Sequence, residues 1–266
     1  QLKSISEARF KFDLEKRGIL HFYHTKLDYE VATKTNALLR EGGLERNPVT
    51  PEEIKSIEPS LKGEYYGGFY CPGDATGDIH KFTTGLAKAS EKYGVKYLFG
   101  MEVSDVQHHA KGVTVLYHAS NENVLLNTAT VESLEADAIV VCAGVGSYHL
   151  ANLLGDRVNI YPVKGYSITL NLNDQDSVKH APWVSLLDES AKIVTSRLGA
   201  DRLRVAGTAE FNGYNLDIRA DRIQPLTDWV NKNFSISTEN VVPWAGLRPM
   251  MPNMMPIVRR GKRERV

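Results

Sequence analysis

Residues 136–147 read ADAIVVCAGVGS, in which a hydrophobic run leads into small residues and then into a helical segment. The pattern predicts a near-continuous buried strand over 134–142, with Cys142 as a buried thiol. Small residues at Ala143 and Gly144 allow the backbone to approach a ligand closely, and free amides at the start of the next helix favour an anion. A tight turn without any ligand explains the same spacing equally well, so this stretch alone does not decide between the two.

The rest of the chain mixes helices and strands without strict alternation. The TPEE run at 50–53 has the pattern of a capping box with proline at the first helical position, and it predicts a short helix that ends before Pro59. Asp78 is expected to cap a helix that runs to about Tyr93, and 159–170 to form a strand. The apolar stripe expected on that helix consists of Ile79, Phe82, Leu86 and Ala89. We therefore expect an α+β fold, or an α/β fold with an inserted mixed sheet.

Composition excludes several classes of protein. The 266 residues contain 32 Lys plus Arg and 32 Asp plus Glu, so the formal net charge is zero and the basic excess of a nucleic-acid-binding protein is missing. No apolar run approaches the roughly 18 residues that cross a bilayer, and no signal peptide is visible. Two cysteines are too few for a disulfide framework, which favours a cytoplasmic location.

Two further stretches occur in order after the first. Residues 161–169 read YPVKGYSIT, and residues 244–256 read WAGLRPMMPNMMP. With 136–147, and with the GGFY run at 67–70, these motifs place the chain close to a known family. It resembles the D-amino-acid oxidase-like superfamily of flavoproteins, and within it the bacterial D-amino-acid dehydrogenases. The resemblance covers nearly the whole chain, and the ordered set of motifs is more specific than any one of them.

The resemblance implies an FAD-linked amine oxidoreductase fold, with a substrate domain and part of an FAD-binding domain. It implies FAD-dependent oxidative deamination of a D-amino acid to a 2-oxo acid and ammonia, by hydride transfer from the substrate Cα to the flavin. The implied partners are a small-molecule D-amino acid and a quinone or other electron acceptor. Peripheral membrane attachment fits such a dehydrogenase, although no residue indicates it. Related amine or 2-hydroxy-acid oxidases, acting on glycine, sarcosine, proline or 2-hydroxyglutarate, remain the alternative.

The same resemblance assigns individual residues. Arg248 is expected to anchor the substrate carboxylate, since its planar fork matches a carboxylate bidentately; a plain salt bridge is the alternative. Tyr166 is expected to bound the substrate pocket; the alternative, that it is an ordinary residue of an amphipathic strand, explains it equally well. The residues expected to contact the cofactor are Val103, Ala143, Gly144 and Gly246. No group of residues has the spacing of a metal site.

Three departures from the family pattern limit these expectations. Asn253 stands where the family has Asp, and neither the initial Gly-x-Gly-x-x-Gly motif nor the final Gly-rich segment is present. Both ends therefore read as cuts, and we expect the chain alone to be unable to retain FAD; a silent folding or interaction module is a further alternative. The expected domains are 1–94 (substrate domain, with about 75–94 in the FAD domain), 95–157 (FAD-binding domain), 158–243 (substrate-binding sheet and helix) and 244–266 (return into the FAD domain).

Overall fold

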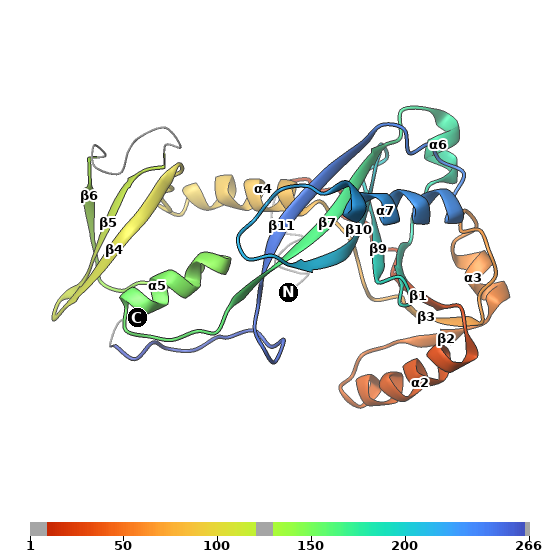
Figure 1. Cartoon of the computed structure of the whole chain (residues 1–266), viewed down its shortest axis with the longest axis horizontal. Helices are drawn as coiled ribbons and strands as arrows, with labels where there is room; N and C mark the ends of the chain where they lie inside the picture. The colour runs from red at the N-terminus through yellow and green to blue at the C-terminus, as the bar shows by residue number, and fades with distance from the viewer. Residues whose placement is uncertain (1–9, 121–129, 264–266) are drawn as a thin grey trace. The chain divides into compact units, whose positions relative to one another are not determined.

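The structure is a computed structural model that describes residues 10–120 and 130–263. The chain divides into two compact units, each described by itself below. Unit 1 comprises 1–94, 165–210 and 216–246, and unit 2 comprises 95–164, 211–215 and 247–266. Figure 1 labels the helices and strands along the chain.

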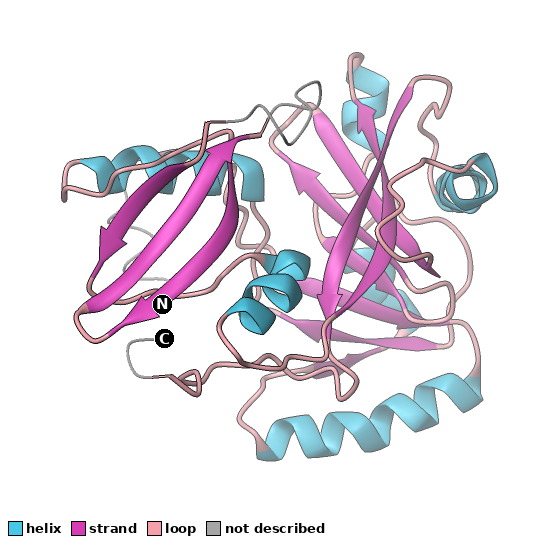
Figure 2. Ribbon diagram, turned by 60° about the vertical axis from the view of Figure 1, so that its left-hand side comes forward, coloured by secondary structure: helices cyan, strands magenta, loops and turns pink. Residues whose placement is uncertain are grey.

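Most residues of an eight-stranded sheet belong to unit 1. The strand order is β11-β7-β10-β9-β8-β1-β3-β2, and Figure 2 shows these strands in magenta. Strand β1 pairs antiparallel with β3 and parallel with β8, so the sheet is mixed. The strands are β1 (Ile19–Tyr23), β2 (Asn47–Val49), β3 (Gly67–Cys71), β7 (Tyr161–Asn171), β8 (Ser185–Asp188), β9 (Ile193–Leu198), β10 (Arg202–Phe211) and β11 (Val241–Met250). The predicted α+β class, with its mixed sheet, is confirmed.

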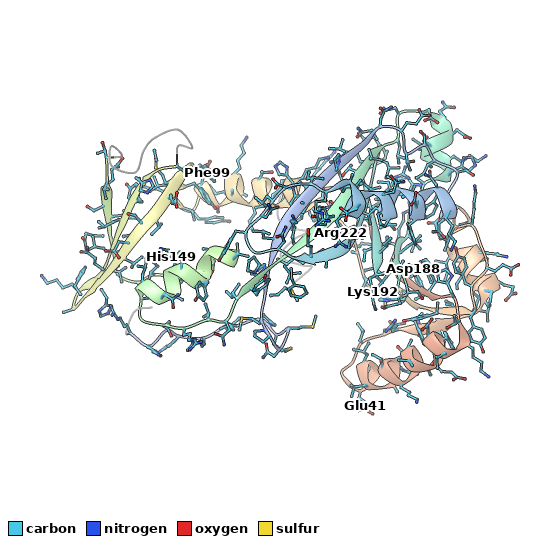
Figure 3. The ribbon with its side chains drawn as sticks, viewed as in Figure 1. Glu41, Phe99, His149, Asp188, Lys192 and Arg222 are labelled. Carbon is cyan, nitrogen blue, oxygen red and sulfur yellow. The ribbon has the colours of Figure 1, made fainter. Side chains whose placement is uncertain are left out.

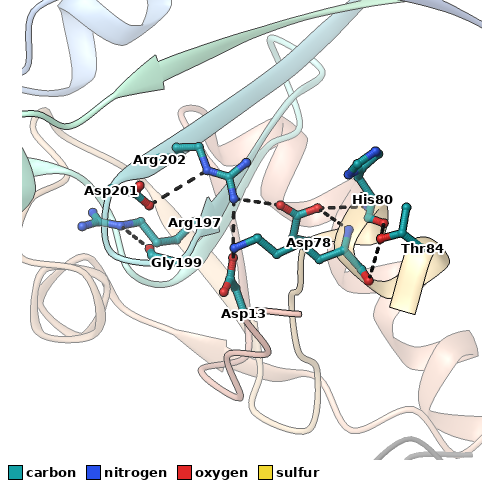
Figure 4. Close-up of polar contacts among 9 residues, drawn as sticks. Asp13, Asp78, His80, Thr84, Arg197, Gly199, Asp201 and Arg202 are labelled. Atoms are coloured by element: carbon teal, nitrogen blue, oxygen red, sulfur yellow. Dashed lines mark hydrogen bonds and ion pairs between the residues drawn. The ribbon is translucent and has the colours of Figure 1, made fainter. Parts of the chain in front are cut away.

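The helices of unit 1 include two whose caps the sequence predicts, at Thr50 and at Asp78. The helices are α2 (Lys26–Glu41), α3 (Pro51–Ile57), α4 (Ile79–Glu91), α6 (Gln175–His180) and α7 (Ala220–Asn233). The capping box of α3 is complete, because Glu53 N donates to Thr50 Oγ1 and Thr50 N donates to Glu53 Oε2. Asp78 accepts hydrogen bonds from His80 N and Lys81 N at the start of α4, and Arg202 Nη2 donates to it at 2.8 Å (Figure 4).

The larger of two core clusters in the described part of unit 1 consists of buried apolar side chains. It includes Leu20 and Phe22 on β1, Ile168 on β7, and Leu226 and Val230 on α7. Hydrophobic burial of this kind contributes about 25 cal/mol per Å² and dominates the stability of a domain.

The predicted apolar stripe of α4 is not buried. Ile79 is 64% and Leu86 is 48% exposed, and α4 has no buried residue. Only Phe82 has close aromatic neighbours, with ring centroids 5.8 Å from Phe10 and 5.2 Å from Phe12. Amphipathic spacing predicted the helix correctly, but it did not determine whether the described residues cover its apolar face.

Unit 2 contains a three-stranded antiparallel sheet and short helical segments. The elements are β4 (Met101–His109), β5 (Gly112–Ala119), β6 (Glu132–Ala136), the 3-10 turn η1 (Gly144–Gly146) and α5 (Ser147–Leu153). Buried Val106, Val113 and Leu154 form its small core. Within the described ranges of the chain, no helix has the length and apolar character needed to cross a bilayer.

The predicted buried strand over 134–142 is wrong in extent and in burial. Strand β6 ends at Ala136, which pairs with Val113 near the beginning of β5, and the following residues have no ladder partner among those described. Val140 is 84% exposed and Cys142 is exposed, whereas Cys71 on β3 is the buried thiol. A hydrophobic run becomes a strand only where a neighbouring strand accepts its backbone hydrogen bonds.

Candidate functional site

A cavity of about 740 Å³ lies within unit 2. Its walls come from the run 139–142, from Gly144, from α5 and from most of the segment 249–261. The side chains that line it are mainly apolar, with Asp156 and Arg259 among the polar exceptions. Arg259 Nη2 donates to Asp156 Oδ1 at 3.2 Å, which fastens the segment after β11 to the residues after α5. Cavities of this volume are typical of sites for small molecules and cofactors.

Of the two small residues predicted to approach a ligand, Gly144 lines this cavity and Ala143 precedes it in the chain. Gly144 has φ +55°, a left-handed conformation that favours glycine, and a Cβ added there would have no heavy atom within 4 Å. Ala143 is exposed, and its N–H donates to Ser147 Oγ at 3.0 Å, which closes the turn into α5. The backbone at Gly144 is therefore open to an approaching group.

Val103, the predicted contact for the adenine end of the cofactor, lies elsewhere in unit 2. It sits on β4 opposite Tyr117, just before an irregularity in the strand pairing. Its side chain packs against the core of Val106, Val113 and Leu154 and does not line the cavity. A contact through its backbone does not depend on that side chain.

Arg248, the predicted substrate anchor, is exposed near the end of β11. Among the described residues, no hydrogen bond or ion pair occupies its guanidinium, so the alternative of a plain salt bridge is not observed. The next residues, Pro249, Met250 and Met251, line the cavity of unit 2. A planar cation without a partner is therefore attached directly to the cavity wall.

Tyr166, the second predicted site residue, is buried in unit 1 with 1% exposure. Its hydroxyl donates to Glu210 Oε2, and Arg219 Nη1 donates to Glu210 Oε1 at 2.9 Å. The phenol therefore contributes to a buried polar network as well as to the core cluster.

Gly246, predicted to contact the cofactor, lies under the ring of Trp244 in unit 1. A Cβ at this position would come within 2.1 Å of Trp244 Cη2. The guanidinium of Arg204 lies 5.1 Å from the centre of the same ring. The packing of Trp244 thus requires a glycine at 246, which gives this residue a structural reason apart from any ligand.

The sequence profile of the FAD dependent oxidoreductase family (DAO) matches residues 2–266. The chain belongs to this family. It is 53% identical over 253 residues to D-amino acid dehydrogenase 3 of Mesorhizobium japonicum, covering 94% of this chain and 59% of that protein. It is 37% identical over 258 residues to the D-amino acid dehydrogenase of Dechloromonas aromatica, covering 95% of this chain and 59% of that protein. The chain thus spans about three fifths of the length of these relatives.

Solved structures of the family share the fold. Glycine oxidase from Geobacillus kaustophilus superposes with a TM-score of 0.83 at 18% identity, covering 99% of this chain and 68% of that one. L-proline dehydrogenase from P. horikoshii gives a TM-score of 0.79 at 17% identity, covering 97% and 67%. At these identities the likeness establishes the architecture of the chain.

The residues of unit 2 fit part of a flavin nucleotide. Gly144 offers an open stretch of backbone, and the apolar wall of the cavity offers a surface for a flat ring. Two features of the structure do not follow from the sequence motifs. One is the wall formed by Met251, Met254 and their neighbours, and the other is Glu210, the buried acceptor for Tyr166. Neither follows a local pattern, although the methionine and proline run at 250–256 marks apolar residues outside a regular element.

Proposed function

We propose that the protein to which these residues belong oxidises a D-amino acid to a 2-oxo acid and ammonia with FAD. The observation that carries the proposal is Arg248, an exposed guanidinium without a described partner, next to residues that line the cavity of unit 2. The relatives named D-amino acid dehydrogenase support the class of substrate. Every amino-acid substrate carries a carboxylate, which is the group that Arg248 is suited to bind.

Arg248 binds and orients the substrate. Its guanidinium donates two parallel hydrogen bonds to the carboxylate, and this fixes two atoms of the substrate at once. With the carboxylate fixed, the Cα–H bond has few remaining orientations, and such positioning lowers the barrier without any strong protein base.

The bound flavin supplies a hydride acceptor. The substrate loses its Cα hydrogen as hydride and one N–H proton to solvent, which leaves an imine. Water then adds to the imine carbon, and ammonia leaves as the 2-oxo acid forms. A flavin held by these residues would then pass the two electrons to a quinone or another acceptor.

In this proposal Ala143 and Gly144 approach the ribose and phosphates of the cofactor, Val103 contacts its adenine through the backbone, and Gly246 passes close to it. We propose that residues 95–157 and 244–266, with about 75–94, belong to the FAD-binding domain, and that residues 158–243 supply the substrate-binding sheet and helix. We also propose that residues 1–266 alone do not retain FAD. Val140 and Val258, two cavity residues, are 84% and 96% exposed, so the wall lacks a cover over these side chains. A purified sample of this chain should lack the visible absorbance of flavin, and a yellow sample with bound FAD would contradict this.

Replacing Arg248 in the full-length enzyme tests the function. Loss of a charge-assisted pair costs about 1.5–3 kcal/mol, which corresponds to a rise in KM for the D-amino acid of about 10- to 150-fold for Arg248→Ala. Arg248→Lys should recover only part of this, because an ammonium group cannot form the bidentate pair. Arg40→Ala, at an exposed arginine in the last turn of α2, is the matched control and should leave KM unchanged. An unchanged KM in Arg248→Ala would refute the assignment of Arg248 as the group that binds the substrate carboxylate.

A further inference from the structure

A second cavity lies entirely within unit 1, and none of its lining belongs to the residues assigned above. It has a volume of about 320 Å³ and is bounded by α2, the end of β1, the residue before β2 and the turn between β8 and β9. Figure 3 labels Lys192, which lies in that turn. The charged side chains of the lining are Asp28, Arg46, Glu189 and Lys192.

Arg46 is buried in the wall of this cavity, with 6% exposure. Its guanidinium lies over the ring of Phe69, 4.9 Å from the centroid, and Nη2 donates to Tyr23 Oη at 2.9 Å. Its Nε has no hydrogen-bond partner, and no carboxylate among the described residues forms an ion pair with it. Among the described residues, a ring face and a neutral phenol hold this buried guanidinium and no carboxylate compensates its positive charge, so an anion would stabilise it.

The other cation of the cavity is already neutralised. Lys192 Nζ lies 3.1 Å from Glu189 Oε2, and His21 Nδ1 lies 3.1 Å from the other carboxylate oxygen of Glu189. The pKa of His21 is lowered first by burial and then by the charge of Arg46, despite the contact with Glu189.

Asp28 supplies an opposite charge on the same cavity. It lies in the first turn of α2, where its Oδ2 accepts a hydrogen bond from Thr25 Oγ1 at 2.7 Å. No described lysine, arginine or histidine forms an ion pair with it, and it is not within ion-pair distance of Arg46. Two opposite charges thus line one cavity without neutralising each other.

We propose that this cavity binds a free α-amino acid as a zwitterion, with its carboxylate on Arg46 and its ammonium group on Asp28. A ligand with only a carboxylate would leave Asp28 without a cationic partner, and a ligand with only an amine would leave Arg46 without an anionic partner. The site goes beyond the proposed function, because it uses neither Arg248 nor any residue of unit 2.

Calorimetric titration of the full-length holoenzyme with L-alanine tests the proposal. L-Alanine carries both charges and is the enantiomer that the proposed reaction does not consume. We expect one saturable site, binding of acetate and of ethylamine each at least tenfold weaker, and at least tenfold loss of L-alanine affinity in Arg46→Gln and in Asp28→Asn. Arg248→Gln should leave this binding unchanged, so failure of the proposed function and failure of this site give different results.

A third variant guards against misfolding of Arg46→Gln. Thr35 is exposed on α2 and lines the cavity, so Thr35→Phe should fill the space and abolish binding without disturbing the core. Thr33→Phe places the same ring on the same helix away from the cavity, and it should bind L-alanine as the wild type does. The proposal is overturned if Thr35→Phe binds L-alanine as the wild type does, or if acetate binds as tightly as L-alanine. It is also overturned if Arg248→Gln is the only variant that loses L-alanine binding.

Discussion

Asp78 connects two parts of unit 1 that are distant in sequence. Replacing it should lower the free energy of unfolding through two contributions that can be measured separately, the helix cap and the contact with Arg202. The carboxylate is 4% exposed and caps α4 through the N–H groups of His80 and Lys81. The same side chain accepts a hydrogen bond at 2.8 Å from Arg202, at the start of β10 (Figure 4). Loss of an N-cap costs about 1 kcal/mol, and loss of a hydrogen bond to a charged group costs about 1.5–3 kcal/mol.

The sum is an upper value, because Arg202 keeps a second carboxylate. Asp13 Oδ2 lies 3.5 Å from Arg202 Nη2, so the guanidinium is not left without a counter-ion. We expect Asp78→Ala to lower the free energy of unfolding by about 2–3 kcal/mol, and Asp78→Asn, which keeps a good capping oxygen but loses the charge, by about 1–2 kcal/mol. Urea unfolding of the full-length protein measures the total. Hydrogen exchange of α4 measures the local part.

The pH dependence separates the charge from the cap. Burial by itself disfavours the ionised form of Asp78, but hydrogen bonds from Lys81 N and Arg202, with the guanidinium charge, outweigh it and lower the pKa. A lowered folded-state pKa gives stability that is present above the unfolded pKa of about 3.9 and is lost as pH falls through the folded value. The difference between wild type and Asp78→Asn should therefore narrow below pH about 4.

Asp174→Ala is the matched control for the cap. Asp174 caps α6 through Ser177 N at 2.7 Å but is exposed and forms no described ion pair, so its loss should be clearly smaller. Equal losses in Asp78→Ala and Asp174→Ala, or a pH-independent difference for Asp78→Asn, would refute the reasoning.

Three further predictions concern other contacts of unit 1. Trp229→Phe removes the hydrogen bond from Nε1 to Asp188 Oδ2 at 2.9 Å and should cost about 1.5–3 kcal/mol at neutral pH in urea unfolding. Burial opposes ionisation of Asp188, but hydrogen bonds led by that of Trp229 lower its pKa. The difference in unfolding free energy between wild type and Trp229→Phe should therefore shrink below pH about 4, and a difference that does not change with pH would contradict this. Gly246→Ala should displace the Trp244 ring, lower the free energy of unfolding by about 1–3 kcal/mol and change tryptophan fluorescence. Adding Trp244→Ala to this variant should relieve the strain. Tyr166→Phe breaks the hydrogen bond to Glu210. If Tyr166 bounds the substrate pocket, as the family resemblance implies, KM should rise about three- to tenfold while kcat stays within about twofold. An equal fall in kcat and kcat/KM, with KM unchanged, would indicate a purely structural role.

Features set by neighbouring residues could be predicted from the sequence. The caps at Thr50 and Asp78 depend on groups within three residues, and both occur as expected. The mixed fold followed from the irregular alternation of strands and helices together with the family motifs. Features set by distant partners could not be predicted in this way.

Three such features show why. The run after Ala136 is apolar, but its conformation depends on whether a second strand lies beside it. Leu86 belongs to a regular stripe, but its exposure depends on what packs against α4. Arg46 follows a glutamate in a polar stretch and reads as a solvated charge, yet Phe69 and Tyr23, both distant in sequence, bury it. Arg248 is exposed and has no partner among the described residues, which agrees with the role that the motif implied, and that role remains a proposal.

Cys142 makes the large cavity chemically addressable. It is exposed and lines the cavity, whereas Cys71 is buried on β3, where burial and then Asp74 raise the pKa of its thiol. Alkylating reagents attack the thiolate, so a maleimide dye should label position 142 quickly and position 71 slowly. The rate of labelling at Cys142 then reports how much of the protein has its cavity occupied by a ligand. Ligands that fill it can be ranked by the protection they give, with no need for turnover or colour.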